Sequence, residues 1–401
     1  MATTLIFVGA PSGVAAWMSK SALALDGQQI IFMIVLVFLC IGISALVYSN
    51  RYYQYLKQKR IKHLEELTRK RFSTYVPNEV VSEILQRPES VNLAGEKRRI
   101  TMLMSDLRGF SVVSESLPPE RVVELLNIYL GRMAGVISKY GGTIDEFIGD
   151  AIFVLFGAPV THEDDGLRAI ACAVDMQINM ADVNAELEDR GLARIEMGIG
   201  VHSGEVVVGS IGSAARAKYG AVGNHVNLTA RIESYTVGGQ ILTTEGALED
   251  AGHSVVIGRQ MELTTKGFSQ PISIFEVEGI GEPYNLSLPI WHEELHDLRP
   301  PWRFDYTILD GKHLTGPEGN GAIRRLSTTG AVVQLSHRVE SLANLKMRLL
   351  GLEDQDEPVG DLYCKVVDEV GDGDLKVRFT AVPIEVADVV RRTCGVDAGA
   401  L

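Results

Sequence analysis

Two aspartates stand where a folded sheet could hold metal ions. Asp106 closes the apolar run RRITMLMSD, which predicts a buried strand, and Asp150 lies in FIGDAIF, between two short strand-like runs. Carboxylates at adjoining strand ends can hold a pair of divalent cations that clamp a phosphoryl displacement. Gly109, in the turn after Asp106, would present backbone N–H groups to phosphates at the start of a helix. Taken alone, each aspartate is equally typical of an ordinary turn.

A second polar pair lies further along the chain. In GAVGNHVNLTARIESYT, Asn227 and Arg231 are four residues apart, so they share one face if the segment is helical. An amide and a guanidinium presented together could orient a ribose and stabilise charge developing on a phosphate. A structural helix with polar surface positions is the competing interpretation.

The elements that would position these residues alternate between strand and helix patterns. Residues 118–142 and 164–187 have helical spacing, whereas residues 143–157 predict a strand pair folded at Gly149 and Asp150. Residues 193–212 predict a further strand pair around Ser203 and Gly204. The fold class we expect is α+β, a ferredoxin-like βαββαβ domain with an antiparallel-rich sheet and helices on one face.

The N-terminal part predicts a membrane helix. Residues 30–48 carry no charge and are long enough to cross a hydrocarbon core of roughly 30 Å. Neither a buried core helix nor a cleaved signal peptide fits this uncharged run, which starts well inside the chain. The cationic residues that follow it predict an extracytoplasmic segment at 1–29 and a cytoplasmic remainder in a single-pass cell-membrane protein. They are Arg51, Lys57, Lys59, Arg60, Lys62, Arg69, Lys70 and Arg71.

Residues 49–97 predict a juxtamembrane helix and linker, in which a coiled coil and a plain charged helix are equally supported. Residues 290–399 contain strand-like runs separated by turn residues and end in a short helix, which predicts a small β-barrel domain. The formal net charge of −13 argues against nucleic-acid binding. The four cysteines form no CxxC pair, which favours reduced thiols over a disulfide framework or zinc site.

The segment 98–281 closely resembles the catalytic domain of the class III adenylate/guanylate cyclases. RRITMLMSDLRGFS, GGTIDEFIGDAIFVLFGAP, GIGVHSGEVVVGSIG and KYGAVGNHVNLTARIES match its motifs in order and spacing. The resemblance implies cyclisation of a purine nucleoside triphosphate with two divalent cations, Mg²⁺ or Mn²⁺, in a head-to-tail homodimer with two sites. It implies that Asn227 positions the ribose and that Arg231 stabilises the transition state. It implies metal ligands at Asp106, Leu107 and Asp150, and substrate contacts at Gly109, Phe110, Ser111, Glu146, Gly220 and Lys266.

Two of these positions bear on the choice of purine. Adenylate cyclases of the family usually have a lysine in the position of Glu146 and an Asp or Thr in the position of Gly220, and this chain departs at both. A carboxylate accepts hydrogen bonds from the N1–H and 2-amino group of guanine, whereas it repels the unprotonated N1 of adenine. Guanylate cyclases pair this Glu with Cys, which Gly220 does not supply. The sequence therefore favours GTP and leaves ATP as the alternative.

Two other functions compete with catalysis. A silent cyclase fold that only dimerises or senses a nucleotide would be expected to lose a metal aspartate or the Asn227–Arg231 pair, and neither is lost. A diguanylate cyclase would lack that pair. The tail distantly resembles a PilZ domain, which binds cyclic di-GMP, but a degenerate barrel used for packing is an equal alternative because Arg325 replaces the usual Asp or Asn. The residues that would carry the ligand are Arg299, Arg303, Ser327 and Gly330.

Overall fold

The computed structural model describes residues 27–72, 95–213, 216–263, 271–289, 293–309, 318–350, 361–371 and 373–395. The chain divides into two compact units, residues 1–76 and 77–401. Residues 73–94 of the predicted juxtamembrane helix and linker, and residues 1–26 of the predicted extracytoplasmic segment, lie outside the described residues.

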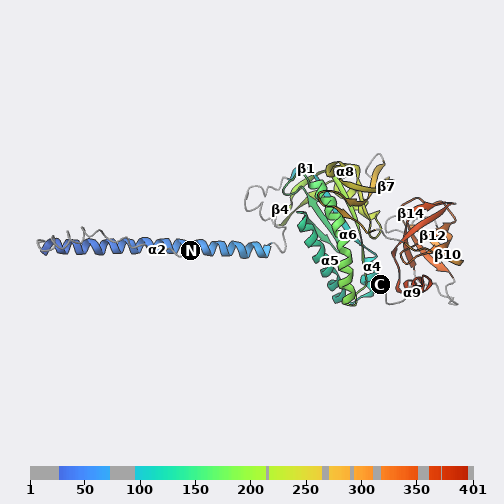
Figure 1. Cartoon of the computed structure of the whole chain (residues 1–401), viewed down its shortest axis with the longest axis horizontal. Coiled ribbons are helices and arrows are strands. Elements are labelled where there is room, and N and C mark those ends of the chain that lie inside the picture. Colours follow the sequence, from blue (N-terminus) through green and yellow to red (C-terminus); the bar gives the residue numbers. More distant parts are fainter. Residues whose placement is uncertain are drawn as a thin grey trace. The chain divides into compact units, whose positions relative to one another are not determined.

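The first unit contains one long helix, α2 (Gly27–Phe72), which is drawn in blue in Figure 1. Its apolar side chains from Ile30 to Tyr48 are exposed. By length and composition, Ile30–Arg60 could cross a membrane, with a mean hydropathy of 3.2 in its most apolar window. The predicted membrane and juxtamembrane helices are therefore parts of one continuous helix. The coiled coil stays a prediction, because side chains beyond Arg60 are not described.

The second unit begins with a mixed sheet whose strands lie in the order β2-β3-β1-β4-β6-β8-β7. Two further strands extend it, since β5 pairs with β4 and β9 pairs with β8. The element order β1, α4 and α5, β2, β3, α6, β4 matches the predicted alternation, and the ferredoxin-like label stays a prediction. The strands are β1 (Glu96–Arg108), β2 (Thr143–Ile148), β3 (Ala151–Phe156), β4 (Glu196–Ser213), β5 (Arg216–Val222), β6 (Ile241–Thr244), β7 (Val255–Leu263), β8 (Ile272–Ile280) and β9 (Leu286–Ser287).

Helices cover both faces of this sheet, which corrects the expectation of helices on one face. On β1, Leu103 and Leu107 pack into the core formed with α5 (Pro119–Lys139) and α6 (Asp165–Asp189), which run side by side in Figure 1. The alternate residues Met102 and Met104 face the other side, where α7 (Asn224–Ser234) packs. The continuous apolar run of β1 follows from burial on both faces. Two short helices, α4 (Phe110–Ser116) and α8 (Glu245–Ala251), complete this part.

The predicted strand pair around Ser203 and Gly204 is wrong, because β4 is one strand of 18 residues that passes straight through both. Gly204 is needed for a close approach and not for a turn. A Cβ at this position would lie 2.3 Å from the ring of His225 on α7. Strand β4 instead pairs along its far half with β5, whose side chains at positions 216 and 217 are not described.

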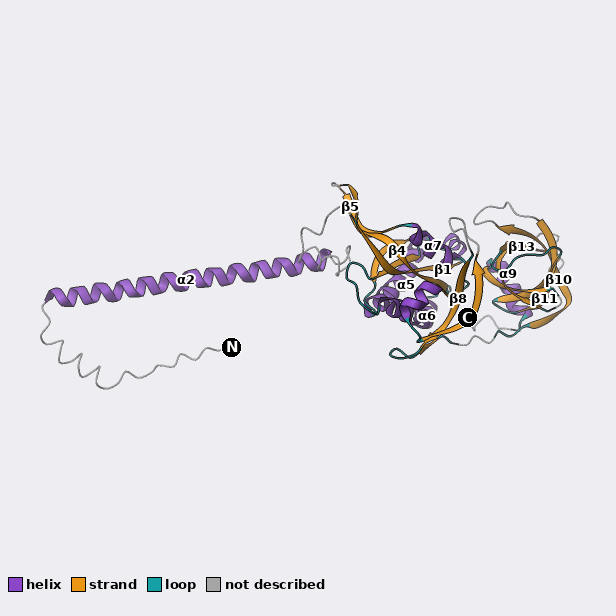
Figure 2. Ribbon diagram, turned by 90° about the horizontal axis from the view of Figure 1, so that it is seen from above, coloured by secondary structure: helices purple, strands orange, loops and turns teal. Residues whose placement is uncertain are grey.

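The C-terminal part is a closed six-stranded barrel in the order β10-β11-β12-β15-β14-β13, with one helix packed on it (Figure 2). Its core contains Phe304, Met347 and Phe379 from three strands and Val386 from the helix. The predicted runs of strand and the terminal helix all form. They are β10 (His296–Leu309), β11 (Glu318–Leu326), β12 (Gly330–Leu335), β13 (Asn344–Leu350), β14 (Asp361–Val370), β15 (Asp374–Ala381) and α9 (Ile384–Thr393).

Candidate active site

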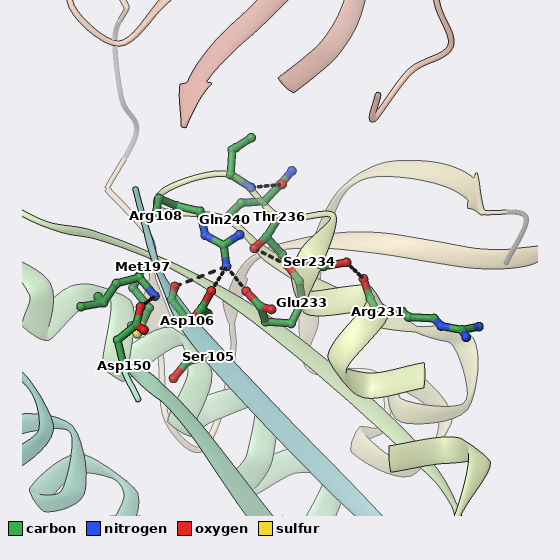
Figure 3. A network of polar contacts seen from close by, with 12 residues as sticks. Ser105, Asp106, Arg108, Asp150, Met197, Arg231, Glu233, Ser234, Thr236 and Gln240 are labelled. Atoms are coloured by element: carbon green, nitrogen blue, oxygen red, sulfur yellow. Dashed lines mark hydrogen bonds and ion pairs between the residues drawn. The ribbon is translucent and has the colours of Figure 1, made fainter. Parts of the chain in front are cut away.

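The fold brings Asp106 and Asp150 together at one end of the sheet. Strands β1 and β3 are antiparallel, with Ser105 opposite Ile152, so the end of β1 lies beside the β2–β3 turn. That turn has Gly149 at a φ of 67°, a left-handed conformation that glycine adopts without a Cβ clash. The backbone N–H of Leu107 donates to Oδ2 of Asp150 at 3.3 Å. The two carboxylates therefore share one site (Figure 3).

The electrostatics of this pair suit a divalent cation. Burial, followed by the negative charge of Asp106, raises the pKa of Asp150 to about 6. A cation bound between the carboxylates would relieve that repulsion. Among the described residues no group of three or more His, Cys, Asp and Glu side chains could hold a metal ion. The two carboxylates fit Mg²⁺, which binds few protein ligands and keeps water or phosphate oxygens in its other positions.

A buried ion pair that the sequence did not predict lies beside the aspartates. Arg108 points between Asp106, at 3.7 Å, and Glu233 on α7, with which it forms an ion pair (Figure 3). The Arg108 and Glu233 side chains are only 12% and 8% exposed, so removing either partner would leave the other buried without its counter-charge. This pair ties the end of β1 to the end of α7. No sequence pattern links the two positions.

The turn after β1 leads directly into the short helix α4, and a Cβ on its Gly109 would lie 2.7 Å from the carbonyl oxygen of Thr380 on β15. Gly109 has a φ of 66° and precedes α4, whose first residue, Phe110, packs against the core. Ser111 is exposed in the first turn of this helix. The first N–H groups of any helix have no partner within it, so they are available to a ligand. Contacts of these three residues with a substrate stay predictions.

Asn227 and Arg231 both lie on α7, with Asn227 exposed and Arg231 half-buried. The Arg231 side chain extends away from Asp106 and Asp150 (Figure 3). The hydroxyl of Ser234 donates to the carbonyl oxygen of Arg231 at 2.7 Å, which fixes the backbone at the end of the helix. The structure thus brings Asp106 and Asp150, the predicted metal pair, together and keeps Arg231 apart from them within one chain.

The two residues predicted to read the base are neighbours on strands β2 and β5. Lys218, on β5, reaches across to β2, since its Nζ lies 2.8 Å from Glu146 Oε2 and 3.2 Å from Asp145 Oδ2. Gly220 lies beside the same group, and a Cβ there would be 2.6 Å from Oδ1 of Asp145. Sequence reasoning missed Lys218 and Asp145, because their meeting depends on how β5 folds back along β4. Lys266 lies outside the described residues.

The barrel residues predicted to bind cyclic di-GMP do not form an obvious anion site. Arg299 and Arg303 are exposed on β10. Ser327 is buried, and its hydroxyl donates to Glu293 Oε1 at 2.6 Å, while the N–H of Gly330 donates to the Ser327 hydroxyl at 2.9 Å. Ser327 is therefore already engaged by a carboxylate. Binding of cyclic di-GMP at this barrel stays a prediction.

A pair of histidines, the buried His202 and the half-buried His225, holds the start of α7 against β4. His202 Nδ1 lies 2.8 Å from the Thr244 hydroxyl, and its Nε2 lies 2.8 Å from Nδ1 of His225. Burial, and then the neighbouring His225 and Arg99, lower the pKa of His202 to about 3. His202 is therefore neutral in the folded protein at ordinary pH.

This shift predicts a loss of stability in acid. Because the folded pKa lies below the unfolded value, the unfolded chain binds the proton first, so stability falls as pH drops below about 6.5 towards 3. Between pH 6.5 and 5 the expected loss is roughly 2 kcal/mol from His202 alone. Urea unfolding of the wild type and of His202→Asn at pH 7.5 and 5.0 measures it. An equal loss in both proteins would rule out His202 as the cause.

Comparison with known proteins identifies the sheet-forming segment. The family model described as the adenylate and guanylate cyclase catalytic domain matches residues 93–274. The chain is 36% identical over 220 residues to an adenylate cyclase of Anabaena cylindrica, which covers 52% of this chain and 42% of that protein. It is 29% identical over 216 residues to adenylate cyclase 1 of Rhizobium meliloti, covering 53% and 32%. The chain thus spans less than half the length of these curated relatives.

Solved structures with similar sequences belong to both substrate classes. The chain is 56% identical to the guanylyl cyclase Cya2, covering 49% of this chain and 99% of that one, with a TM-score of 0.48. It is 33% identical to the adenylyl cyclase CyaB from P. aeruginosa, covering 46% and 96%, with a TM-score of 0.45. The names of these relatives therefore do not decide between ATP and GTP.

Proposed function

Because residues 93–274 belong to the class III adenylate and guanylate cyclases, we propose that this chain converts a purine nucleoside triphosphate into a 3′,5′-cyclic monophosphate and pyrophosphate. The observation that carries the proposal is the meeting of Asp106 and Asp150 at one end of the sheet, with a raised pKa that a bound cation would relieve. Both aspartates and the Asn227–Arg231 pair are present, so a silent cyclase fold is the weaker alternative.

The proposed active form is a homodimer with two sites. Arg231 extends away from the metal pair of its own chain, so a complete site needs Asn227 and Arg231 from a second copy. Exposed apolar side chains on β2, β4 and β5 support such an interface. They are Phe147, Ile148, Val207, Ile211 and Val222. A symmetric pair of such chains would bury this surface twice and complete two sites.

The mechanism assigns a role to each side chain. Asp106 and Asp150 would hold two divalent cations, which when bound lower the pKa of the ribose 3′-hydroxyl and neutralise charge on the leaving pyrophosphate. Asn227 would orient the ribose so that its 3′-oxygen lies in line with the α-phosphorus. The new bond joins that oxygen to the α-phosphorus, the bond to pyrophosphate breaks, and the hydroxyl proton is lost to solvent. Arg231 would stabilise charge on the phosphoryl oxygens.

We propose that α2 anchors the enzyme in the cell membrane with the catalytic part in the cytoplasm. The length and apolar surface of Ile30–Arg60 support a single span. The cationic residues after residue 50 support the orientation, because they are retained on the cytoplasmic side.

The activity itself is tested with the full chain in detergent micelles. With Mn²⁺ and either GTP or ATP, we expect cyclic nucleotide and pyrophosphate in equal amounts. Nucleotide binding without either product would establish the silent, nucleotide-sensing alternative.

For the purine, we propose GTP over ATP on the basis of Glu146. Lys218 and Asp145 fix the position of the Glu146 carboxylate, and the two carboxylates raise the pKa of Lys218 despite its partial burial, so it stays a cation. The oxygens of the Glu146 carboxylate can accept from the N1–H and 2-amino group of guanine. An adenine would place an acceptor against it.

This proposal predicts that Glu146→Lys shifts the preference towards ATP, because an ammonium donates where the carboxylate accepted. One charge-assisted hydrogen bond is worth roughly 1.5–3 kcal/mol, so the ratio of kcat/KM for GTP and ATP should change by at least about tenfold. Gly220 contributes no side chain, so the switch should be partial. Glu249→Lys, an equal charge change at an exposed position of α8, is the matched control. An unchanged ratio with activity retained would show that Glu146 does not contact the base.

A further inference from the structure

Lys365 is a buried lysine on the outside of the barrel. Its neighbours on β14, Leu362, Cys364 and Val366, point into the barrel core, so by strand alternation Lys365 points outward. An outward lysine on a small barrel would normally be in water, yet Lys365 is only 2% exposed. The surface that covers it belongs to the cyclase part of the chain.

Lys365 contacts the C-terminal end of α7. Its Nζ donates to the carbonyl oxygens of Ser234, at 2.5 Å, and Thr236, at 3.2 Å, and lies 5.9 Å from the centre of the Tyr235 ring. The last carbonyls of a helix have no partner within it and carry partial negative charge, so an amine placed there acts as a cap. Burial lowers the pKa of Lys365 to about 7, and both protonation states can donate to these carbonyls.

A second barrel residue packs against the same helix. Leu342 is 6% exposed and belongs to an apolar cluster that contains Leu228 and Ile232 of α7. It has a φ of 69°, a left-handed conformation that a leucine rarely adopts. Such a conformation is strained for a residue with a Cβ and persists only where the surrounding contacts hold it. Its N–H donates to Val366 O at 2.8 Å, on the strand of Lys365.

These contacts lie next to the residues that act on the substrate. Leu228 directly follows Asn227, Ile232 directly follows Arg231, and Ser234 holds the Arg231 carbonyl. We propose that the C-terminal barrel positions α7 for cyclisation, with Lys365 and Leu342 as positioning residues. The barrel thereby becomes part of the catalytic machinery of the neighbouring domain. This inference rests on the proposed cyclase function.

The first test is Lys365→Met in the full chain, which keeps an unbranched apolar side chain and removes both hydrogen bonds. A small displacement of a positioned catalytic group can cost up to about a hundredfold in rate, so we expect kcat to fall by at least about tenfold while KM changes little. Lys346→Met is the matched control, because Lys346 also points outward, lies on the adjacent strand β13, and pairs with Asp361 of β14 within the same domain. A kcat for Lys365→Met that equals or exceeds the wild-type value, or an equal loss in Lys346→Met, would overturn the proposal.

Hydrogen exchange on the same proteins provides a readout that does not depend on activity. We expect Lys365→Met to speed exchange in residues 228–237, at the end of α7, and to leave β12 and β15 protected. Unchanged exchange in residues 228–237 would contradict the cap even if the wild type makes no cyclic nucleotide. If Lys365→Met loses the protection of β12 and β15, Leu342→Ala decides. We expect Leu342→Ala to lower kcat and to speed exchange in residues 228–237 in the same way. A wild-type kcat and wild-type exchange in Leu342→Ala would refute the proposal.

Discussion

We expect Asp106→Ala or Asp150→Asn to abolish cyclic nucleotide formation, with a fall in kcat of at least about a thousandfold, while the proposed dimer persists. Each change removes one of two carboxylates that would hold the cations, and no other described cluster could replace them. Asp150→Asn keeps the shape of the side chain and an oxygen that can accept from the N–H of Leu107. The loss should therefore come from the charge and not from the turn.

The same substitution has a predictable effect on stability. The pKa of Asp150 is raised to about 6 in the fold, first by burial and then by Asp106. A carboxyl whose folded pKa lies above its unfolded value destabilises the fold when it ionises, so without metal Asp150→Asn should be as stable as the wild type or more stable above pH 6. A variant that loses turnover but gains thermal stability would show that the carboxylate is kept for activity at a cost to the stability of the fold.

The measurements are turnover, Mn²⁺ binding by electron paramagnetic resonance, thermal unfolding and dimer mass. Asp182→Asn, at an exposed position of α6, is the control for loss of one negative charge. Wild-type rates in either aspartate variant at saturating Mn²⁺ would refute the metal assignment. Loss of the dimer along with activity would mean that the aspartates support the fold.

The sequence predicted the parts of the site that depend on local pattern. The apolar run before Asp106 is a strand because it is buried on both faces, and Gly149 makes the turn at Asp150. The terminal barrel strands follow from turn residues between apolar runs. These features are set by residues within a few positions of one another, which is why periodicity and turn chemistry suffice.

Features that depend on distant contacts were missed. Gly204 looked like a turn residue, but it lies within an unbroken strand, where a side chain would clash with a histidine 21 positions later. The ion pair of Arg108 with Glu233 and the cap from Lys365 join segments that only the fold brings together. A buried lysine or arginine cannot be recognised in a single sequence, because these residue types are mostly found on the surface.

Arg231→Ala is expected to lower kcat by about a hundredfold or more, with a smaller effect on KM, because a guanidinium placed against developing charge acts mainly in the transition state. Arg231 is half-buried at the end of α7 and extends away from the metal pair of its own chain. In the proposed dimer, Arg231→Ala would therefore disable the site completed with the partner's aspartates and leave Asp106 and Asp150 of its own chain intact. Asp106→Ala does the reverse.

Co-expression of these two variants should restore activity. The variants carry different affinity tags, and tandem purification isolates the heterodimer. One of its two sites then combines an intact metal pair from the Arg231→Ala chain with an intact Asn227 and Arg231 from the Asp106→Ala chain, so about half of the wild-type activity per dimer should return. A heterodimer of Asp106→Ala with Asp150→Asn is the control, because each of its sites lacks one carboxylate and should stay inactive. If the first heterodimer is as inactive as its parents, each site is built within one chain, and the separation of Arg231 from the aspartates must close by a movement of α7 instead.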